Sequence, residues 1–189
     1  AQSEIEEYKD MIKKTDNLHM QYLLLQEAII EKKKSNYYKA VQFLQQSLEC
    51  TECSKVMLLK NEMILLTDIE VQICYELAEC MHFQKYEDDA FEIYRRLKIY
   101  MEIIDCDKKI NFTYYPHVLF RLAQLEAEKY NLGQAYEYLD TAEKYIIQEY
   151  EIYNLQEILE LKQKIELIMG RQSSSPEKDN FLLALKLIT

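Results

Sequence analysis

The chain has 189 residues, of which 49% are hydrophobic and 30% are charged, with two glycines, two prolines and no tryptophan. So few glycines and prolines cannot supply the turns of a sandwich or barrel built from many short strands. The hydrophobic fraction excludes a disordered or low-complexity chain. The sequence therefore predicts an all-α protein, and its length predicts a single domain.

Charge narrows the range of partners. Lys and Arg number 23 against 33 Asp and Glu, which gives a formal net charge of −10. The electric field around a chain with this negative charge repels phosphate backbones and anionic lipids. No apolar run is long enough to span a bilayer, and the first residues are acidic where a secretory signal is basic and then apolar. We therefore expect a cytoplasmic protein with no membrane contact.

The 3.6-residue periodicity of apolar side chains predicts helices along the whole chain. They are expected at 3–14, 17–34, 36–50, 68–83, 86–105, 113–131, 133–149, 152–169 and 177–188. Residues 1–16 form a leading helix or linker, and 51–67 form a long connection with partial helix. The other helices pair into hairpins at 17–50, 68–105, 113–149 and 152–188 within one helical-repeat domain, 1–189.

Capping residues mark several of these helix ends. Asn36 and Asp68 each precede an apolar stripe and are candidates for the N-cap. Pro116 suits the first turn of a helix. Gly170 is expected to end one helix, and Ser175 before the second proline to start the next.

Small residues recur at a fixed separation. Three pairs of alanines lie twelve positions apart: Ala28 with Ala40, Ala78 with Ala90, and Ala123 with Ala135. A large residue follows each second alanine by four positions: Leu44, Tyr94 and Leu139. Two antiparallel helices approach closely only where both carry a small side chain, so a helical hairpin repeats such pairs. The spacing predicts three related hairpins.

This pattern resembles the tetratricopeptide repeat. The start of the family's second helix is matched by Tyr37-Tyr38-Lys39-Ala40, by Tyr86 to Ala90 and by Gly133-Gln134-Ala135. The second alanines are 50 residues apart from Ala40 to Ala90 and 45 from Ala90 to Ala135, against ~34 in the family, so these hairpins are lengthened. The last hairpin matches only at Ala184. The resemblance implies a right-handed superhelix of antiparallel helical hairpins, an α-α superhelix.

Residues 15–170 also resemble the C-terminal sensor domains of peptide-pheromone-responsive transcription regulators of the Rgg/PlcR type. The likeness rests on the long hairpins, the sixteen tyrosines, the run Asn111 to Ala123 and the segment Leu66-Thr67-Asp68-Ile69-Glu70. In that family the repeat domain follows a helix-turn-helix domain, binds a short linear peptide on its concave face and dimerises. The resemblance implies the sensor and dimerisation domain of a cytoplasmic bacterial transcription regulator, with DNA bound only through a domain upstream of Ala1.

The resemblance also implies a set of peptide-binding residues, because the first helix of each hairpin lines the concave surface of such a superhelix. Inner positions lie six and three residues before the small residue, and one and four after it. They give Gln72, Tyr75, Glu79 and His82 in the second hairpin and His117, Phe120, Gln124 and Ala127 in the third. Together with the neighbouring arginine, the expected peptide-binding set is Gln72, Tyr75, Glu79, His117, Phe120, Arg121 and Gln124. The first hairpin contributes Tyr22, Leu25, Ile29 and Lys32 by the same count. Amides suit an extended backbone, rings suit side-chain pockets and an arginine suits a carboxylate. Ordinary packing or solvated positions are the alternative for each.

The sequence contains no motif for catalysis or for a cofactor. Gly133 and Gly170 are the only glycines, so no phosphate-binding loop is possible, and the three histidines lie far apart. The five cysteines include one CxxC spacing, Cys50 with Cys53, but no second pair, and reduced thiols are expected. We expect neither a metal nor a cofactor. The alternative function is a free-standing tetratricopeptide-like interaction scaffold, and an enzyme ranks third.

The last predicted helix, 177–188, is apolar nearly all round from Phe181 to Ile188. Stacked repeats need a cap on their terminal apolar faces. We therefore expect this helix to pack on the fourth hairpin with one face and on a second copy of the chain with the other, in a homodimer.

Overall fold

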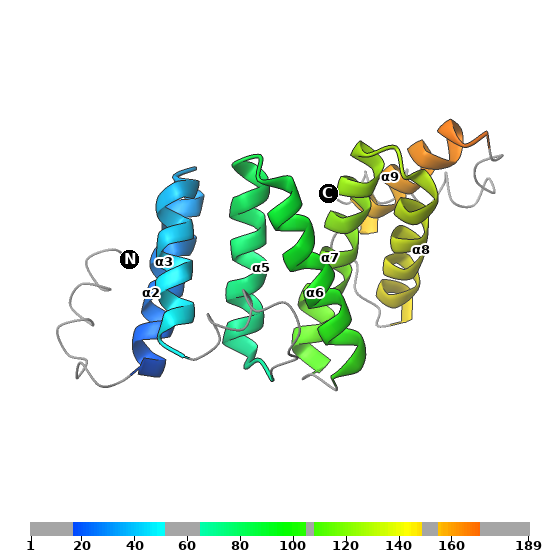
Figure 1. Cartoon of the computed structure of the whole chain (residues 1–189). Helices are drawn as coiled ribbons and strands as arrows, with labels where there is room; N and C mark the ends of the chain where they lie inside the picture. The colour runs from blue at the N-terminus through cyan, green and yellow to red at the C-terminus, as the bar shows by residue number, and fades with distance from the viewer. Residues whose placement is uncertain (1–16, 52–64, 105–107, 149–154, 171–189) are drawn as a thin grey trace. The chain divides into compact units, whose positions relative to one another are not determined.

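The structure is a computed structural model, and it describes residues 17–51, 65–104, 108–148 and 155–170. All regular secondary structure in these ranges is helical, in seven helices (Figure 1), which confirms the all-α prediction. The chain divides into two compact units, unit 1 (Ala1–Tyr100) and unit 2 (Met101–Thr189). The helices predicted at 3–14 and 177–188 lie outside the described residues, as does most of the connection 51–67.

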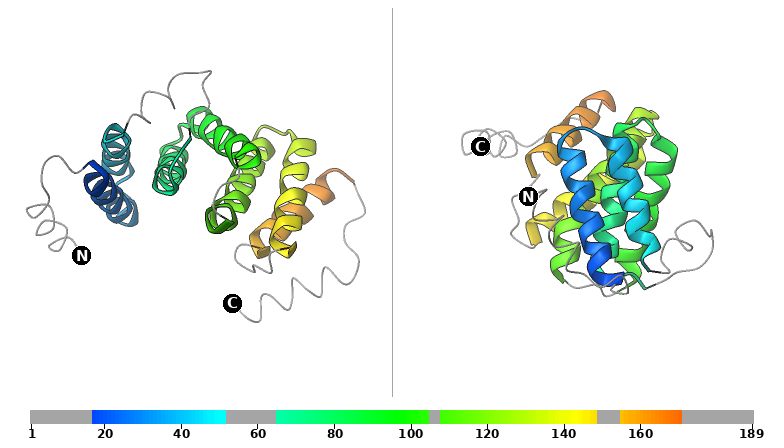
Figure 2. Two further views of the ribbon diagram at one scale, coloured as in Figure 1. Left: turned by 90° about the horizontal axis from the view of Figure 1, so that it is seen from below. Right: turned by 90° about the vertical axis from the view of Figure 1, so that its left-hand side faces the viewer.

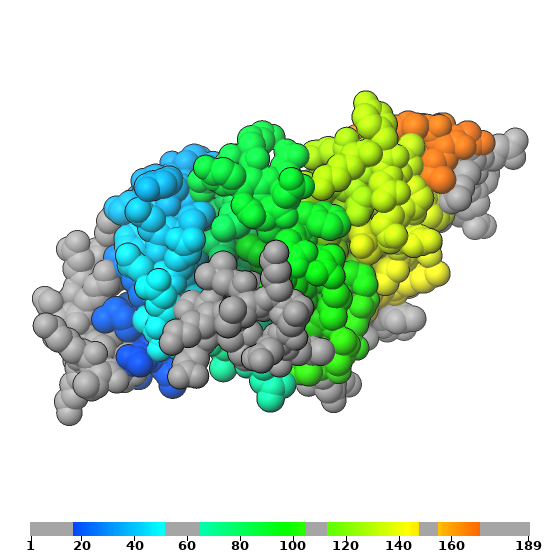
Figure 3. All heavy atoms as spheres, in the orientation of Figure 1, coloured from blue at the N-terminus to red at the C-terminus, as the bar shows by residue number. Residues whose placement is uncertain are grey.

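Unit 1 contains two helical hairpins. The first pairs α2 (Asn17–Lys33) with α3 (Tyr37–Glu49), and the second pairs α5 (Asp68–Phe83) with α6 (Glu87–Ile103), whose last residues belong to unit 2. Helices α2 and α3 run side by side in both views of Figure 2, and α3 also packs on α5. In Figure 3 the cyan atoms of α3 meet the green atoms of the second hairpin. The predicted boundaries of these four described helices are correct to within two residues.

Unit 2 contains α7 (Lys108–Glu128), α8 (Leu132–Gln148) and α9 (Leu155–Ile168). Helix α8 packs on α7 and on α9. Gly170 follows α9 in the left-handed region, with φ 65°, and donates its amide hydrogen to the carbonyl of Leu167, so it ends the helix as predicted. The start predicted at Ser175 and Pro176 lies outside the described residues.

The predicted start of α7 is wrong. This helix begins at Lys108 rather than near 113, so Pro116 lies inside it and not in its first turn. A proline inside a helix removes one backbone hydrogen bond and costs about 3 kcal/mol. Pro116 is buried, and so are Tyr115, Val118 and Leu119 beside it. Burial of this apolar stretch offsets the local cost, an effect of packing that overrides the local signal.

The cap of α5 also differs from the prediction. Thr67, not Asp68, is the N-cap residue, and it forms a capping box with Glu70. The Thr67 hydroxyl accepts a hydrogen bond from the backbone N–H of Glu70, and Glu70 Oε2 accepts one from the backbone N–H of Thr67 at 2.7 Å. The sequence carried this signal, because Thr67-Asp68-Ile69-Glu70 has the spacing of a capping box.

The three hairpin turns share one backbone geometry. In each, a residue other than glycine adopts the left-handed conformation: Ser35 (φ 60°), Lys85 (φ 69°) and Tyr130 (φ 59°). The next residue donates its N–H to the carbonyl five positions earlier: Asn36 to Glu31, Tyr86 to Met81, and Asn131 to Glu126, at 2.9 to 3.0 Å. This is the Schellman arrangement that ends many helices. The left-handed residue always lies five positions before the second alanine, so the three turns repeat in register.

Side chains reinforce two of the three turns in the same way. Asn36 Nδ2 donates to Glu31 Oε2 at 2.9 Å, and Asn131 Nδ2 donates to Glu126 Oε2 at 2.9 Å. Asn36 therefore stands at the predicted N-cap position of α3 but makes no side-chain capping bond there. Its side chain ties the end of α2 instead.

The alanine pairs and the large residues that follow them are buried. The six alanines and Leu44, Tyr94 and Leu139 are all at most 1% exposed. Alanines at these places let the two helices of a hairpin approach closely, and the large residue fills the adjoining space. Their burial is consistent with the expected meeting of the two helices of each hairpin at these alanines.

One tyrosine clamps the segment that leads into α5. The backbone N–H of Leu66 donates to Tyr100 Oη at 2.9 Å, and Tyr100 Oη donates to the carbonyl of Leu66 at 3.0 Å. A single hydroxyl from the end of α6 thus satisfies both backbone polar groups of a residue that precedes α5, groups that are costly to leave unpaired when buried.

Candidate functional site

The predicted peptide-binding residues fall into two groups. Gln72, Tyr75 and Glu79 lie on α5 in unit 1, and the other four lie on α7 in unit 2. The seven residues thus fall into two sets, one within each unit.

Two of the three α5 residues are not accessible. Tyr75 and Glu79 are buried, at 9% and 4% exposure, and Gln72 is half-buried. The Tyr94 hydroxyl from α6 donates to Glu79 Oε1 at 2.6 Å, and the rings of Tyr75 and Tyr94 lie 6.1 Å apart. The expectation that Tyr75 and Glu79 are exposed inner positions is wrong, because a tyrosine on the partner helix recruits both into the packing of the hairpin.

The first hairpin contributes a cation to the same cluster. Lys32 Nζ on α2 donates to Glu76 Oε2 at 2.7 Å and lies 3.7 Å from Glu79 Oε2. Both carboxylates are on α5, so the first helices of the two hairpins are linked directly. Glu76 was not singled out from the sequence, because an acidic residue on a helix surface carries no local sign of a partner on another hairpin. Of the remaining inner positions in this hairpin, Leu25 is buried and Tyr22 is exposed.

The four residues on α7 form one stripe, which we call the α7 stripe: His117, Phe120, Arg121 and Gln124. Their spacing of three, four and seven positions places them on one face of the helix. All four are half-buried, between the core and full exposure. Arg121 Nη1 donates to Gln124 Oε1 at 2.8 Å, so the two polar side chains hold each other in place. The stripe combines an imidazole, a phenyl ring, a guanidinium and an amide.

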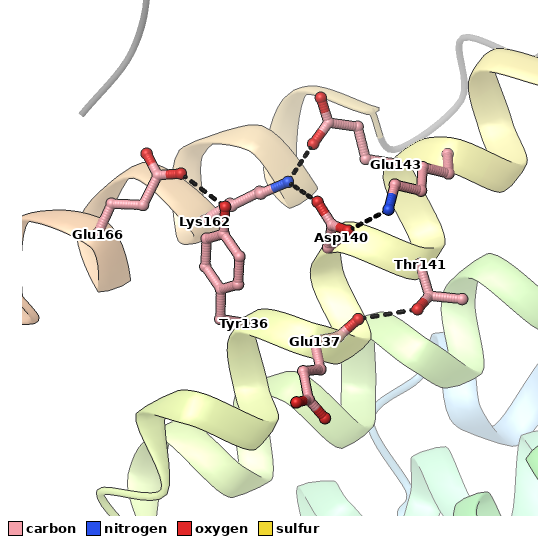
Figure 4. Close-up of polar contacts among 8 residues, drawn as sticks. Tyr136, Glu137, Asp140, Thr141, Glu143, Lys162 and Glu166 are labelled. Carbon is pink, nitrogen blue, oxygen red and sulfur yellow. Dashed lines mark hydrogen bonds and ion pairs between the residues drawn. The ribbon is translucent and has the colours of Figure 1, made fainter. Parts of the chain in front are cut away.

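A second polar cluster joins α8 to α9 (Figure 4). Lys162 Nζ donates to Asp140 Oδ1 and to Glu143 Oε2, both at 2.6 Å, and lies 4.9 Å from the centre of the Tyr136 ring. The Tyr136 hydroxyl donates to Glu166 at 3.1 Å. The side chain of Lys162 is 4% exposed. The cluster therefore ties two helices together through a buried cation.

The pKa of Lys162 indicates that this cluster holds α8 and α9 together rather than taking part in chemistry. Burial lowers the pKa of Lys162, but the hydrogen bonds to Asp140 and Glu143 outweigh burial and raise it above its usual value. A lysine that keeps its proton and donates to two carboxylates is not poised as a nucleophile. This tie has a sign in the sequence, since Lys162 lies between Ile158 and Ile165 on the apolar stripe of α9, where a lysine requires a partner.

Three of the five cysteines lie in the described ranges. Cys50, Cys74 and Cys80 form no disulfide, and burial raises the pKa of the Cys80 thiol to about 12. Cys53 of the CxxC spacing and Cys106 lie outside those ranges. No group of three or more His, Cys, Asp or Glu among the described residues could hold a metal ion.

Among the helices that the structure describes, none combines the length and the apolar content needed to cross a membrane. A scan of protein families finds no family model that matches the chain, and a search of curated proteins finds no match.

Proposed function

We propose that the chain is the sensor and dimerisation domain of a cytoplasmic bacterial transcription regulator and that it binds a short linear peptide on the α7 stripe. The observation that carries the proposal is the α7 stripe, where four half-buried residues of mixed chemistry lie on one face of a first helix. A face built only for packing would select small or branched apolar residues there.

The chemistry of the α7 stripe suits an extended peptide. The amide of Gln124 and the imidazole of His117 can exchange hydrogen bonds with a peptide backbone, and the Phe120 ring can border a side-chain pocket. The bond from Arg121 to Gln124 reduces the freedom of both side chains before any ligand arrives. Less conformational entropy is then lost on binding.

The mechanism that accompanies the proposal is a population shift. A peptide that binds one arrangement of the dimer more tightly than another moves the equilibrium toward that arrangement by its difference in affinity. In a regulator of the kind proposed, such a shift changes the spacing of DNA-binding domains attached upstream of the sensor, and so their fit to two half-sites.

The test begins with selection of short random-sequence peptides displayed against the intact chain. Enriched peptides are then titrated calorimetrically against wild type, Arg121→Ala and Gln124→Ala. Arg95→Ala is the matched control, because Arg95 is an exposed arginine on α6 whose guanidinium bonds Glu92 on its own helix. Loss of a charged hydrogen bond predicts at least about tenfold weaker binding for Arg121→Ala, with no change for Arg95→Ala.

Two outcomes contradict the proposal. Unchanged affinity in both α7 variants would remove the α7 stripe as the site. Failure of every short peptide to bind alone, together with binding of a folded partner, would favour the interaction scaffold. The dimer is tested separately by light scattering at tens of micromolar chain, where a strict monomer counts against dimerisation.

A further inference from the structure

The two hairpin turns of unit 1 lie side by side. Tyr37, the first residue of α3, and Phe83, the last residue of α5, stack their rings with centroids 4.9 Å apart and planes 13° apart. Each residue adjoins a turn, and both turns stand at the upper end of unit 1 in Figure 1. We call residues 33–39 the first segment and residues 83–89 the second segment of the turn edge of unit 1.

This edge exposes aromatic rings. Tyr38 is 69% exposed, and Phe83 is 44% exposed although it also stacks on Tyr37. Aromatic rings offer a large contact area and lose little side-chain freedom on binding, and they are enriched at protein–protein contacts. The turn edge therefore has the apolar centre that an interface needs.

The charges of the turn edge are divided between its two segments. The first segment contains three lysines and no acidic residue, and the second contains three acidic residues and one lysine. Lys34 and Lys39 pair with the buried Glu31 at 2.9 and 3.8 Å, yet their side chains remain 48% and 47% exposed. Lys33 and Asp89 are exposed as well. The first segment thus presents a basic surface, and the second presents an acidic one.

We infer that the turn edge of unit 1 is an interface that binds the same edge of a second copy of the chain. A two-fold axis through the edge places the basic first segment of each copy against the acidic second segment of the other. The rings of Tyr38 and Phe83 then meet between the charged halves. Because the axis makes every contact twice, both halves are complementary at once.

The division of charge favours a second copy over a partner of one sign. A uniformly acidic or basic partner meets like charge over half of this edge, and like charges that face each other weaken binding. A second copy supplies both signs in the required order. The contact rests on the dimer of the proposed function and names its surface, but it involves neither the α7 stripe nor the last predicted helix, 177–188.

The test is a charge exchange between two variants of the full-length chain, measured by sedimentation equilibrium. In a dimer of Lys33→Glu alone, the new carboxylate faces the acidic second segment twice. In a dimer of Asp89→Lys alone, the new ammonium group faces the lysines of the first segment twice. Each variant should therefore dimerise at least about tenfold more weakly than wild type. An equimolar mixture of the two should recover wild-type affinity, because opposite charges face each other again.

Two further measurements accompany the exchange. Lys164→Glu is the matched control, since Lys164 is an exposed lysine on α9 in unit 2, and this variant should dimerise as wild type does. Wild type needs no substitution for the second measurement. Raising the salt concentration from about 0.05 to 0.5 M should weaken its dimer several-fold, because salt screens exposed charges.

Four outcomes overturn this interface. Wild-type affinity in both variants, with unchanged helical circular dichroism, would place the contact elsewhere and leave the proposed dimer standing. Weaker association that mixing does not restore would show that the edge does not pair with its own counterpart. A dimer that is insensitive to salt would show that these charges do not hold it. A wild-type chain that is monomeric at tens of micromolar would also remove the dimer from the proposed function, whereas the peptide titration judges the α7 stripe separately.

Discussion

The Tyr94 hydroxyl and the Glu79 carboxylate form a buried hydrogen bond of 2.6 Å between the two helices of the second hairpin. Glu79 also lies 3.7 Å from Lys32 of the first hairpin. The carboxylate thus joins three helices at one point. Because a buried carboxylate that loses a donor pays the cost of desolvation, this bond should contribute measurably to stability.

Tyr94→Phe should lower the free energy of unfolding by about 1.5–3 kcal/mol, because it keeps the ring but removes a hydrogen bond to a charged group. Urea denaturation followed by circular dichroism measures the change. Tyr86→Phe serves as the control, since Tyr86 is 57% exposed, and a change within about 0.5 kcal/mol is expected there. Equal changes in the free energy of unfolding for the two variants would show that the hydroxyl of Tyr94 does not contribute to stability.

Glycine at the left-handed position of each hairpin turn should stabilise the protein. Ser35, Lys85 and Tyr130 adopt φ values that cost an L-residue about 1–2 kcal/mol, whereas glycine adopts them freely. Glycine also gives the unfolded chain more conformational entropy, which cancels part of this gain. Each substitution should therefore raise the free energy of unfolding by about 0.5–1 kcal/mol. The melting temperature of each variant measures this.

The matched control for those turn variants is a glycine substitution that should lower the free energy of unfolding instead of raising it. Gln42 is exposed in the middle of α3, where Gln42→Gly should cost about 1 kcal/mol. A loss of stability in all four glycine variants would mean that the left-handed conformation is not a source of strain in the turns.

The alanine pairs can be tested by overpacking. Ala123 is fully buried in α7, so Ala123→Phe should destabilise the protein by about 1–3 kcal/mol. Ala127→Phe makes the same change one turn later at a half-exposed position, and a smaller effect is expected there. Thermal unfolding compares the two. A tolerated Ala123→Phe would mean that α7 and α8 do not need a small residue where they pack.

Acid should weaken the tie between α8 and α9. Hydrogen bonds from Lys144 and then from Lys162 hold the pKa of Asp140 below its usual value. The unfolded chain therefore takes up this proton more readily than the folded chain. The contribution of Asp140 is fully present above its unfolded pKa of about 3.9 and is lost as the pH falls through the folded pKa.

The comparison that isolates this effect is wild type against Asp140→Asn. Below about pH 5 the free energy of unfolding of wild type should fall more steeply with decreasing pH than that of the variant. Urea titrations at a series of pH values supply both curves. Parallel curves would show that the pairing of Asp140 with lysine does not contribute to stability.

The positions of the described helices followed from apolar periodicity, since α5 begins and ends at the predicted residues 68 and 83. The alanine spacing predicted hairpins in which paired helices meet at small residues, and all six alanines are buried. Local signals failed where tertiary packing opposed them. Pro116 is the clearest case, as burial of its neighbours carries α7 through a residue that ordinarily opens a helix.

The candidate site was harder to predict for the same reason. A count of inner positions treats each helix alone, and it cannot foresee that Tyr94 on the partner helix captures both Tyr75 and Glu79. On α7 the count, with the neighbouring arginine, selected His117, Phe120, Arg121 and Gln124, which are all half-buried. The burial of Tyr75 and Glu79 therefore depends on a residue of the partner helix, which a count along one helix does not include.

The clamp between Tyr100 and Leu66 couples two segments that are 34 residues apart. Because one hydroxyl holds both backbone groups of Leu66, detachment of the segment before α5 from the end of α6 breaks two hydrogen bonds at once. The start of one helix and the end of the next should therefore open as a single cooperative unit rather than fray independently, as exposed helix ends ordinarily do. The hydroxyl of Tyr100 should therefore link the unfolding of the start of α5 to the unfolding of the end of α6.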